Sequence, residues 1–177
     1  MRTPACLALA AALLVSGCRD TAPLAGVQAR ESTTQPAADL LARGEYMVRI
    51  GGCNDCHTDG YAQQQGQVPK AAWLTGSPLG YTGPWGTTYA ANLRTRLGGM
   101  DEAQWLAYSA NLRTRPIMPD YELRAMSEAD RRAIYHFVRS LGPGGNDAPA
   151  YLPPGSRPPP PYMELVLPPT AGAAGAR

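Results

Sequence analysis

The sequence lacks a strong excess of charge of either sign. Its 177 residues include 16 basic and 14 acidic residues, which gives a formal net charge of +2 with both histidines neutral. Proteins that bind the phosphates of nucleic acid usually carry a marked basic excess. The composition therefore argues against nucleic acid as a partner.

The start of the sequence lacks an apolar run long enough to cross a membrane. Ten consecutive apolar residues, Cys6 to Val15, follow the positive charge of Arg2, whereas a spanning helix needs about 20. This pattern is typical of a signal peptide. The next residues, Val15-Ser16-Gly17-Cys18, resemble the lipobox of bacterial lipoproteins, which implies cleavage before Cys18 and acylation of that cysteine.

The lipobox resemblance predicts the location of the protein. Residues 1–17 are expected to be a signal peptide, and the lipid on Cys18 is expected to anchor the protein on the periplasmic side of a bacterial membrane. Each buried methylene of the lipid contributes about 0.8 kcal/mol to anchoring. The resemblance is compatible with either the inner or the outer membrane. A secreted protein in which Cys18 is incidental is the alternative.

Two cysteines and two histidines remain in the exported part, once Cys6 is removed and Cys18 carries lipid. They are Cys53, Cys56, His57 and His136. A structural zinc site normally takes four ligands in a tetrahedron. Because His57 directly follows Cys56, and His136 is predicted on the solvent side of a helix, zinc is a weak interpretation.

The motif C-N-D-C-H also invites a thiol-redox interpretation. A thioredoxin-like pair is expected at the start of a helix that follows a strand. Residues 38–52, which precede Cys53, have the pattern of a helix, and no strand–helix–strand unit is visible. Export to an oxidising compartment keeps this interpretation open, but the pattern does not favour it.

The third interpretation of the motif is covalent haem, because C-x-x-C-H is the attachment signature of c-type haem. Cys53 and Cys56 are spaced to reach two vinyl groups on one porphyrin edge, and His57 is placed to become an iron ligand. The motif predicts one covalently bound haem c. It also requires a second axial ligand downstream or an open coordination site.

Methionine is the usual second ligand in electron-transferring c-type cytochromes. Met118 lies between Pro116 and Pro119, which predict a stiff extended loop able to hold a thioether against iron. Met118 is therefore the predicted ligand. The other downstream methionines precede predicted helix caps or lie in the proline-rich tail: Met100, Met126 and Met163.

His136 is the rival ligand, and it lies in a predicted helix over residues 127–142. Ser127 and Asp130 form a capping pattern at its start, and Gly142 followed by Pro143 ends it. Its apolar residues share one face: Ile134, Phe137, Val138 and Leu141. His136 falls on the opposite face, so a solvated histidine is expected.

Two further helices are predicted. One begins at Gln35-Pro36 and contains Gly44, which costs roughly 1 kcal/mol relative to alanine inside a helix and so suggests close approach of the last helix. The other covers residues 101–112, with Asp101 as its cap. Strand signals are confined to a few residues near 87–90.

These features together resemble a class I monohaem cytochrome c, of the kind found with quinoprotein and flavoprotein dehydrogenases of Gram-negative bacteria. The resemblance covers roughly residues 40–145 and is carried by RGEYMVRIGGCNDCH, GTTYAANL, DEAQWLAYS, IMPDY and RRAIYHFVRSLGP. It implies thioether bonds from Cys53 and Cys56, with His57 and Met118 as axial ligands. It also implies three residues at the haem edge, for which packing is the alternative role: Trp85, Tyr89 and Asn92.

The resemblance implies an all-α class I cytochrome c fold, with helices and long loops around one haem. The expected organisation is a signal peptide (1–17), a flexible linker (18–34), a cytochrome c domain (35–142) and a proline-rich tail (143–177). The tail has too little charge and apolar content to form its own core. Its stretch 162–167 is expected to lie across the domain.

The expected function is one-electron transfer, from a dehydrogenase donor to a cytochrome or oxidase acceptor, without a turnover reaction of its own. A haem-c sensor or peroxidase-like protein with a displaceable sixth ligand is the alternative. A third possibility is a structural or thiol-redox lipoprotein without haem.

A repeated hexapeptide, ANLRTR, occurs at 91–96 and 110–115 and places four arginines within 22 residues. A solvated face is the expected role. Docking of an acidic partner and contact with haem propionates are the alternatives.

Overall fold

The computed structural model describes residues 37–166. The predicted signal peptide, the lipidation site Cys18 and the linker lie outside the described residues. The elements in chain order are α1 (Ala37–Ile50), α2 (Cys53–His57), the 3-10 turn η1 (Lys70–Ala72), β1 (Gly80–Gly83), β2 (Gly86–Tyr89), α3 (Leu93–Gly98), α4 (Glu102–Asn111), α5 (Asp120–Ala125), α6 (Glu128–Ser140) and β3 (Tyr162–Glu164).

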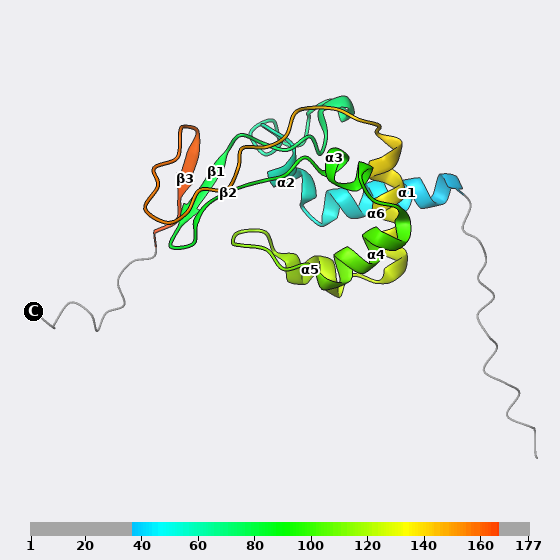
Figure 1. Cartoon of the computed structure of the whole chain (residues 1–177). Helices are drawn as coiled ribbons and strands as arrows, with labels where there is room; N and C mark the ends of the chain where they lie inside the picture. Colours follow the sequence, from blue (N-terminus) through cyan, green and yellow to red (C-terminus); the bar gives the residue numbers. More distant parts are fainter. Residues whose placement is uncertain (1–36, 167–177) are drawn as a thin grey trace, which may run out of the picture. The chain divides into compact units, whose positions relative to one another are not determined.

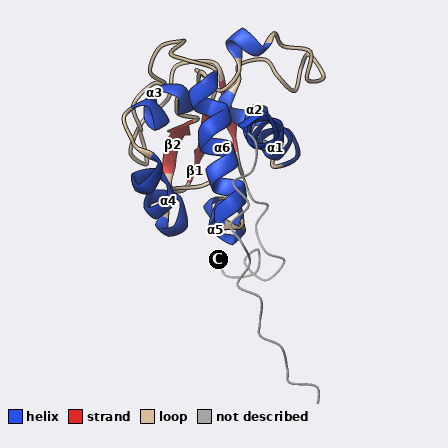
Figure 2. Cartoon of the chain, turned by 90° about the vertical axis from the view of Figure 1, so that its right-hand side faces the viewer, coloured by secondary structure: helices blue, strands red, loops and turns tan. Residues whose placement is uncertain are grey.

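The main helix contact joins α1 to α6, which lie far apart in the sequence. Figure 2 shows α6 crossing the middle of this part of the chain, with α1 and α2 on one side and α3 and α4 on the other. A side-chain carbon added at Gly44 would clash with the carbonyl oxygen of Ala133 and lie 2.6 Å from Cβ of Phe137. The predicted close approach of the last helix at Gly44 is therefore confirmed.

The predicted helix starts at Asp101 and Ser127 are confirmed. The Asp101 side chain accepts a hydrogen bond from the Gln104 amide, and the Gln104 side-chain oxygen accepts one from the Asp101 amide, which forms a capping box at α4. Ser127 accepts from the Asp130 amide at the start of α6. These bonds satisfy amides that have no partner within the first turn of a helix.

A small sheet forms where the sequence indicated only a few strand residues. β1 pairs antiparallel with β2 and parallel with β3, so the strand order is β2-β1-β3 (Figure 1). The expected docking of 162–167 is confirmed for Tyr162–Glu164, which form β3. A small sheet beside several helices neither establishes nor contradicts an all-α fold. The all-α class I cytochrome c fold therefore stays a prediction.

The core holds the helices and the loop before β1 together. Its largest fully buried side chains include Trp73, Leu74 and Leu97. Trp73 contacts Phe137 of α6 edge to face, with ring centroids 6.3 Å apart. Within residues 37–166, no helix combines the length and the apolar character that crossing a bilayer requires.

Candidate functional site

The C-N-D-C-H motif forms the short helix α2, which follows α1 after a two-glycine turn. Gly52 caps α2 with a φ of 66°, a left-handed conformation that glycine adopts without steric cost. Cys53 and Cys56 lie three residues apart on this single turn and are both free thiols. The turn and the helix therefore place both cysteines and His57 within one short segment.

His57 is buried, and one of its ring nitrogens is hydrogen-bonded within the protein. Its Nδ1 lies 2.7 Å from the carbonyl oxygen of Ala91. A carbonyl oxygen can only accept, so Nδ1 carries the hydrogen and Nε2 keeps its lone pair. No hydrogen bond to Nε2 is found among residues 37–166. Burial lowers the pKa of His57, and the bond to Ala91 opposes this only in part, so the ring favours the neutral form that binds metals.

Backbone hydrogen bonds hold the segment that carries the Ala91 carbonyl against the motif. The Gly76 amide donates to the His57 carbonyl at 2.8 Å, and the Ser77 amide donates to the Ala90 carbonyl at 3.2 Å. Gly76 has a φ of 85°, and a side-chain carbon there would lie 3.0 Å from the Ala90 oxygen. The segment after β2 is thereby fixed against the motif, which orients the histidine ring.

Cys53 does not have the electrostatic environment of a redox-active cysteine. Burial raises the pKa of the Cys53 thiol to about 11. Thiol exchange needs the thiolate, and redox-active cysteines usually have a lowered pKa. Cys53 also follows a helix and a turn rather than a strand. The geometry therefore gives the thiol-redox interpretation no support.

The remaining histidine, His136, belongs to a contact between two helices. Its Nε2 lies 2.7 Å from a carboxylate oxygen of Glu102, and its side chain is 38% exposed. The sequence predicted a solvated histidine and missed this acidic partner on α4. Within the described part of the chain, no group of three or more His, Cys, Asp or Glu side chains is arranged to hold a metal ion.

Met118 lies on the loop between α4 and α5, and its side chain is partly exposed. In Figure 1 this loop extends from α5 towards the strands. The Thr88 hydroxyl of β2 donates to the Pro116 carbonyl at 2.7 Å. His57 bonds to the segment just after β2, and the Met118 loop bonds to β2 itself. The ring of His57 and the loop that carries Met118 are therefore both hydrogen-bonded to residues 86–92.

The three predicted haem-edge residues have different surroundings. The Tyr89 hydroxyl is buried and has no hydrogen-bond partner among the described residues. The Trp85 indole nitrogen lies 3.4 Å from the Tyr81 carbonyl, which is a long contact. Asn92 caps α3 by accepting from the Thr95 amide, and its own amide donates to the Gly144 and Asn146 carbonyls. The side-chain amide of Asn92 is therefore already hydrogen-bonded within the protein.

An unpartnered buried hydroxyl costs free energy, on the order of 1–3 kcal/mol. A bound group with an acceptor oxygen, such as a propionate, would satisfy the Tyr89 hydroxyl. The available Nε2 of His57 and the free thiols of Cys53 and Cys56 are the groups that a c-type haem requires. These residues therefore fit a covalently bound haem.

Arg94 contradicts the expectation of a solvated arginine face. It is buried, and its guanidinium donates to three carbonyls, those of Trp73 at 2.8 Å, Lys70 at 2.8 Å and Leu141 at 3.2 Å. The carbonyls replace the water that a guanidinium would otherwise bind. Only the fold, which brings these carbonyls together, distinguishes Arg94 from the other arginines of the repeat.

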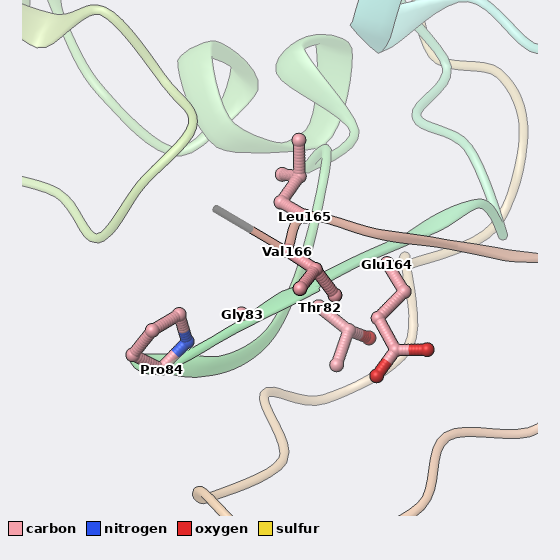
Figure 3. Close-up of a pocket in the computed structure, with 6 residues that line it drawn as sticks. All are labelled: Thr82, Gly83, Pro84, Glu164, Leu165 and Val166. Atoms are coloured by element: carbon pink, nitrogen blue, oxygen red, sulfur yellow. The ribbon is translucent and has the colours of Figure 1, made fainter. Parts of the chain in front are cut away.

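The structure also has a hollow beside the small sheet. It is lined by the β1–β2 turn and by the end of β3, with the side chains of Thr82, Pro84 and Glu164 around it (Figure 3). It contains none of the predicted site residues, so it has no part in the candidate site.

In comparisons with known proteins, no family model, no curated protein and no solved structure matched the chain. The assignment of the site therefore depends on the residues themselves and on their geometry.

Proposed function

We propose that this protein is a one-electron carrier with a single c-type haem, anchored by lipid at Cys18 and facing the periplasm. Cys53 and Cys56 would hold the haem through thioether bonds, and His57 and Met118 would be its axial ligands. The observation that carries the proposal is the hydrogen bond from His57 Nδ1 to the Ala91 carbonyl. It leaves Nε2 available on a histidine that directly follows a C-x-x-C pair.

The bound haem would supply the reversible one-electron change between ferric and ferrous iron. The chain supplies orientation and environment. The Ala91 carbonyl fixes the ring of His57 and increases the basicity of its other nitrogen. A methionine thioether favours the reduced state and raises the potential. The Tyr89 hydroxyl, which has no partner among the described residues, would donate to a propionate.

Two protein ligands leave no open position for a substrate, so the protein transfers electrons without a reaction of its own. Its expected partners are a dehydrogenase as donor and a cytochrome or oxidase as acceptor. The partial exposure of Met118 (36%) favours one second candidate. In a haem-c sensor or peroxidase-like protein, that ligand would be displaced by a small molecule.

The absorption spectrum of the full chain, produced in a host that attaches c-type haem, tests the proposal. We expect a c-type spectrum, together with the weak far-red band of a sulfur–iron bond in the oxidised state. Met118→Ala should remove the far-red band. Met163→Ala, which changes an exposed methionine on β3, should retain it. A colourless wild-type protein would overturn the proposal.

The same preparation separates the two candidates. A far-red band that persists in the presence of oxygen, nitric oxide and peroxide supports the carrier. Its loss on addition of one of these molecules supports the sensor or peroxidase-like protein. His57→Ala should abolish normal haem ligation, whereas His136→Ala should leave the spectrum unchanged because His136 contacts Glu102 on α4.

A further inference from the structure

The base of the Met118 loop is held by contacts within the loop and α5. The Asp120 carboxylate accepts from the Thr114 amide at 2.6 Å and pairs with Arg124. The Arg124 guanidinium in turn donates to the Leu112 carbonyl at 2.7 Å. These contacts fix where the loop leaves α4 and where it enters α5. The Met118 carbonyl also accepts from the Asp120 amide at 2.9 Å and from the Thr114 hydroxyl at 3.3 Å, whereas residues 115–117 at the tip are not held by these bonds.

The tip of the loop, residues 115–117, contacts residues from elsewhere in the chain. The Pro116 carbonyl accepts from Thr88 of β2 at 2.7 Å. Next to it, the guanidinium carbon of Arg115 lies 3.8 Å from the centroid of the Tyr151 ring. A cation–π contact at an exposed site corresponds to about a two- to fivefold change in an equilibrium constant.

Tyr151 is itself fixed to the β1–β2 hairpin. Its hydroxyl donates to the Trp85 carbonyl at 2.9 Å. The next residue, Leu152, exchanges two backbone hydrogen bonds with Thr87, of 2.8 and 3.1 Å. The C-terminal segment thus places an aromatic ring at a defined position beside the hairpin, where Arg115 can stack on it.

We propose that Arg115 and Tyr151 form a latch through which the C-terminal segment positions the Met118 loop. This inference rests on the proposed function, because it concerns the regulation of the same axial ligand. Ile117 and Met118 are 39% and 36% exposed, so their own burial holds the tip only weakly. Arg115 and Tyr151 are positioning residues, and losing their contact should let Met118 yield more readily to an external ligand.

The haem-loaded full chain with imidazole as the competing ligand tests the latch. Imidazole is titrated into the oxidised protein, and its binding is followed by the loss of the far-red band. Arg115→Gln and Tyr151→Leu should each bind imidazole about two- to fivefold more tightly than the wild type. Because both changes remove the same contact, the double variant should bind no more tightly than either single variant.

Arg113→Gln is the matched control. It removes the same charge from the same loop, but the guanidinium of Arg113 donates to the carbonyl of its neighbour Leu112. Its affinity for imidazole should equal that of the wild type. If both latch variants also match the wild type, the proposal is overturned.

Hydrogen exchange over residues 113–118, measured by mass spectrometry, gives a readout that does not depend on haem ligation. Exchange should be faster in both latch variants than in Arg113→Gln. Unchanged exchange overturns the latch, and faster exchange with unchanged imidazole affinity overturns its role in positioning Met118. A wild-type protein without haem would instead refute the proposed function, while the exchange comparison would still decide whether the latch holds the loop.

Discussion

At the scale of single residues, two polar atoms of the candidate site have no hydrogen-bond partner among residues 37–166. His57 uses Nδ1 within the protein, and no partner for Nε2 is found among the described residues. Tyr89 buries its hydroxyl without a partner in the same part of the chain. Buried polar groups are nearly always hydrogen-bonded. The Tyr89 hydroxyl is one exception among the described residues, and Asn54 Nδ2 of the motif and Arg131 Nε of α6 are the others.

Tyr89→Phe gives a test in which the sign of the effect is decisive. If the hydroxyl donates to the bound haem, removing it should lower the free energy of unfolding of the haem-loaded protein by about 1 kcal/mol. Denaturant unfolding of the variant and the wild type measures this difference. An increase in stability would show that the hydroxyl is unpartnered in the loaded protein as well.

Tyr121→Phe is the control for this test. Tyr121 is 61% exposed, so its hydroxyl is solvated whether or not haem is bound. Its removal should leave the stability unchanged within about 0.5 kcal/mol, as for surface substitutions in general.

At the scale of elements, the contact between α1 and α6 depends on one missing side chain. Gly44 lies against the backbone of Ala133 and the Cβ of Phe137. Gly44→Ala should lower the free energy of unfolding by about 1–3 kcal/mol, since the clash forces the helices apart and outweighs the gain in helix propensity. Denaturant unfolding measures the loss.

Gly98→Ala is the matched control, because Gly98 also lies in a helix, α3. An added carbon there would meet only the Arg139 guanidinium, at 3.9 Å. This change should be neutral or slightly stabilising. Equal losses in the two variants would contradict the role assigned to close packing at Gly44.

Carboxylates that form ion pairs between helices should make the free energy of unfolding depend on pH. The pKa of Glu102 is lowered chiefly by its hydrogen bond to Arg132, and that of Asp130 chiefly by its bond to Arg43. A lowered folded-state pKa contributes stability above the ordinary pKa of the group, and this contribution is lost as pH falls through the folded value. Stability should therefore decline below about pH 4.5, the region where free Glu and Asp titrate.

Glu102→Gln removes one of these carboxylates, together with its contact to His136. The Glu102 and Arg132 side chains are each 36% exposed, so solvent screening limits their pair to about 0.5 kcal/mol. At about pH 6 the variant should be less stable than the wild type by this amount, and the difference should shrink towards about pH 3. Urea unfolding at both pH values measures it, and a difference that grows in acid would contradict the assignment.

At the scale of the whole described chain, the C-terminal segment completes the structure around the hairpin. β3 pairs with β1 in parallel, Leu152 bridges to Thr87, and Asn92 donates to Gly144 and Asn146. The tail lacks a core of its own, but it supplies hydrogen-bond partners to the segment that holds His57 and the Met118 loop.

A chain that ends at Gly142 should therefore lose stability. It gives up several hydrogen bonds worth about 1 kcal/mol each, so the free energy of unfolding should fall by roughly 3 kcal/mol. A chain that ends at Val166 keeps every contact described here and is the control. Comparable stability of the two shortened chains, measured by urea unfolding, would show that the segment is dispensable.

The sequence alone was enough to predict features that depend on neighbouring residues. The spacing of Cys53, Cys56 and His57 identified the motif, and the caps at Asp101 and Ser127 identified helix starts. Even one long-range contact could be inferred, because Gly44 is costly within a helix unless something packs against it. These signals are readable because capping and helical periodicity act over three or four residues.

Only the tertiary structure decided which distant groups meet. It gave His57 the Ala91 carbonyl as partner and gave Arg94 three carbonyls in place of solvent. It also left the Tyr89 hydroxyl without a partner in the part of the chain that the structure describes. The glycine-rich β1 became a strand because β2 and β3 pair with it, since strand formation depends more on its neighbours than on its own residues. The local pattern therefore predicted the chemistry of the motif, while the folded backbone determined its surroundings.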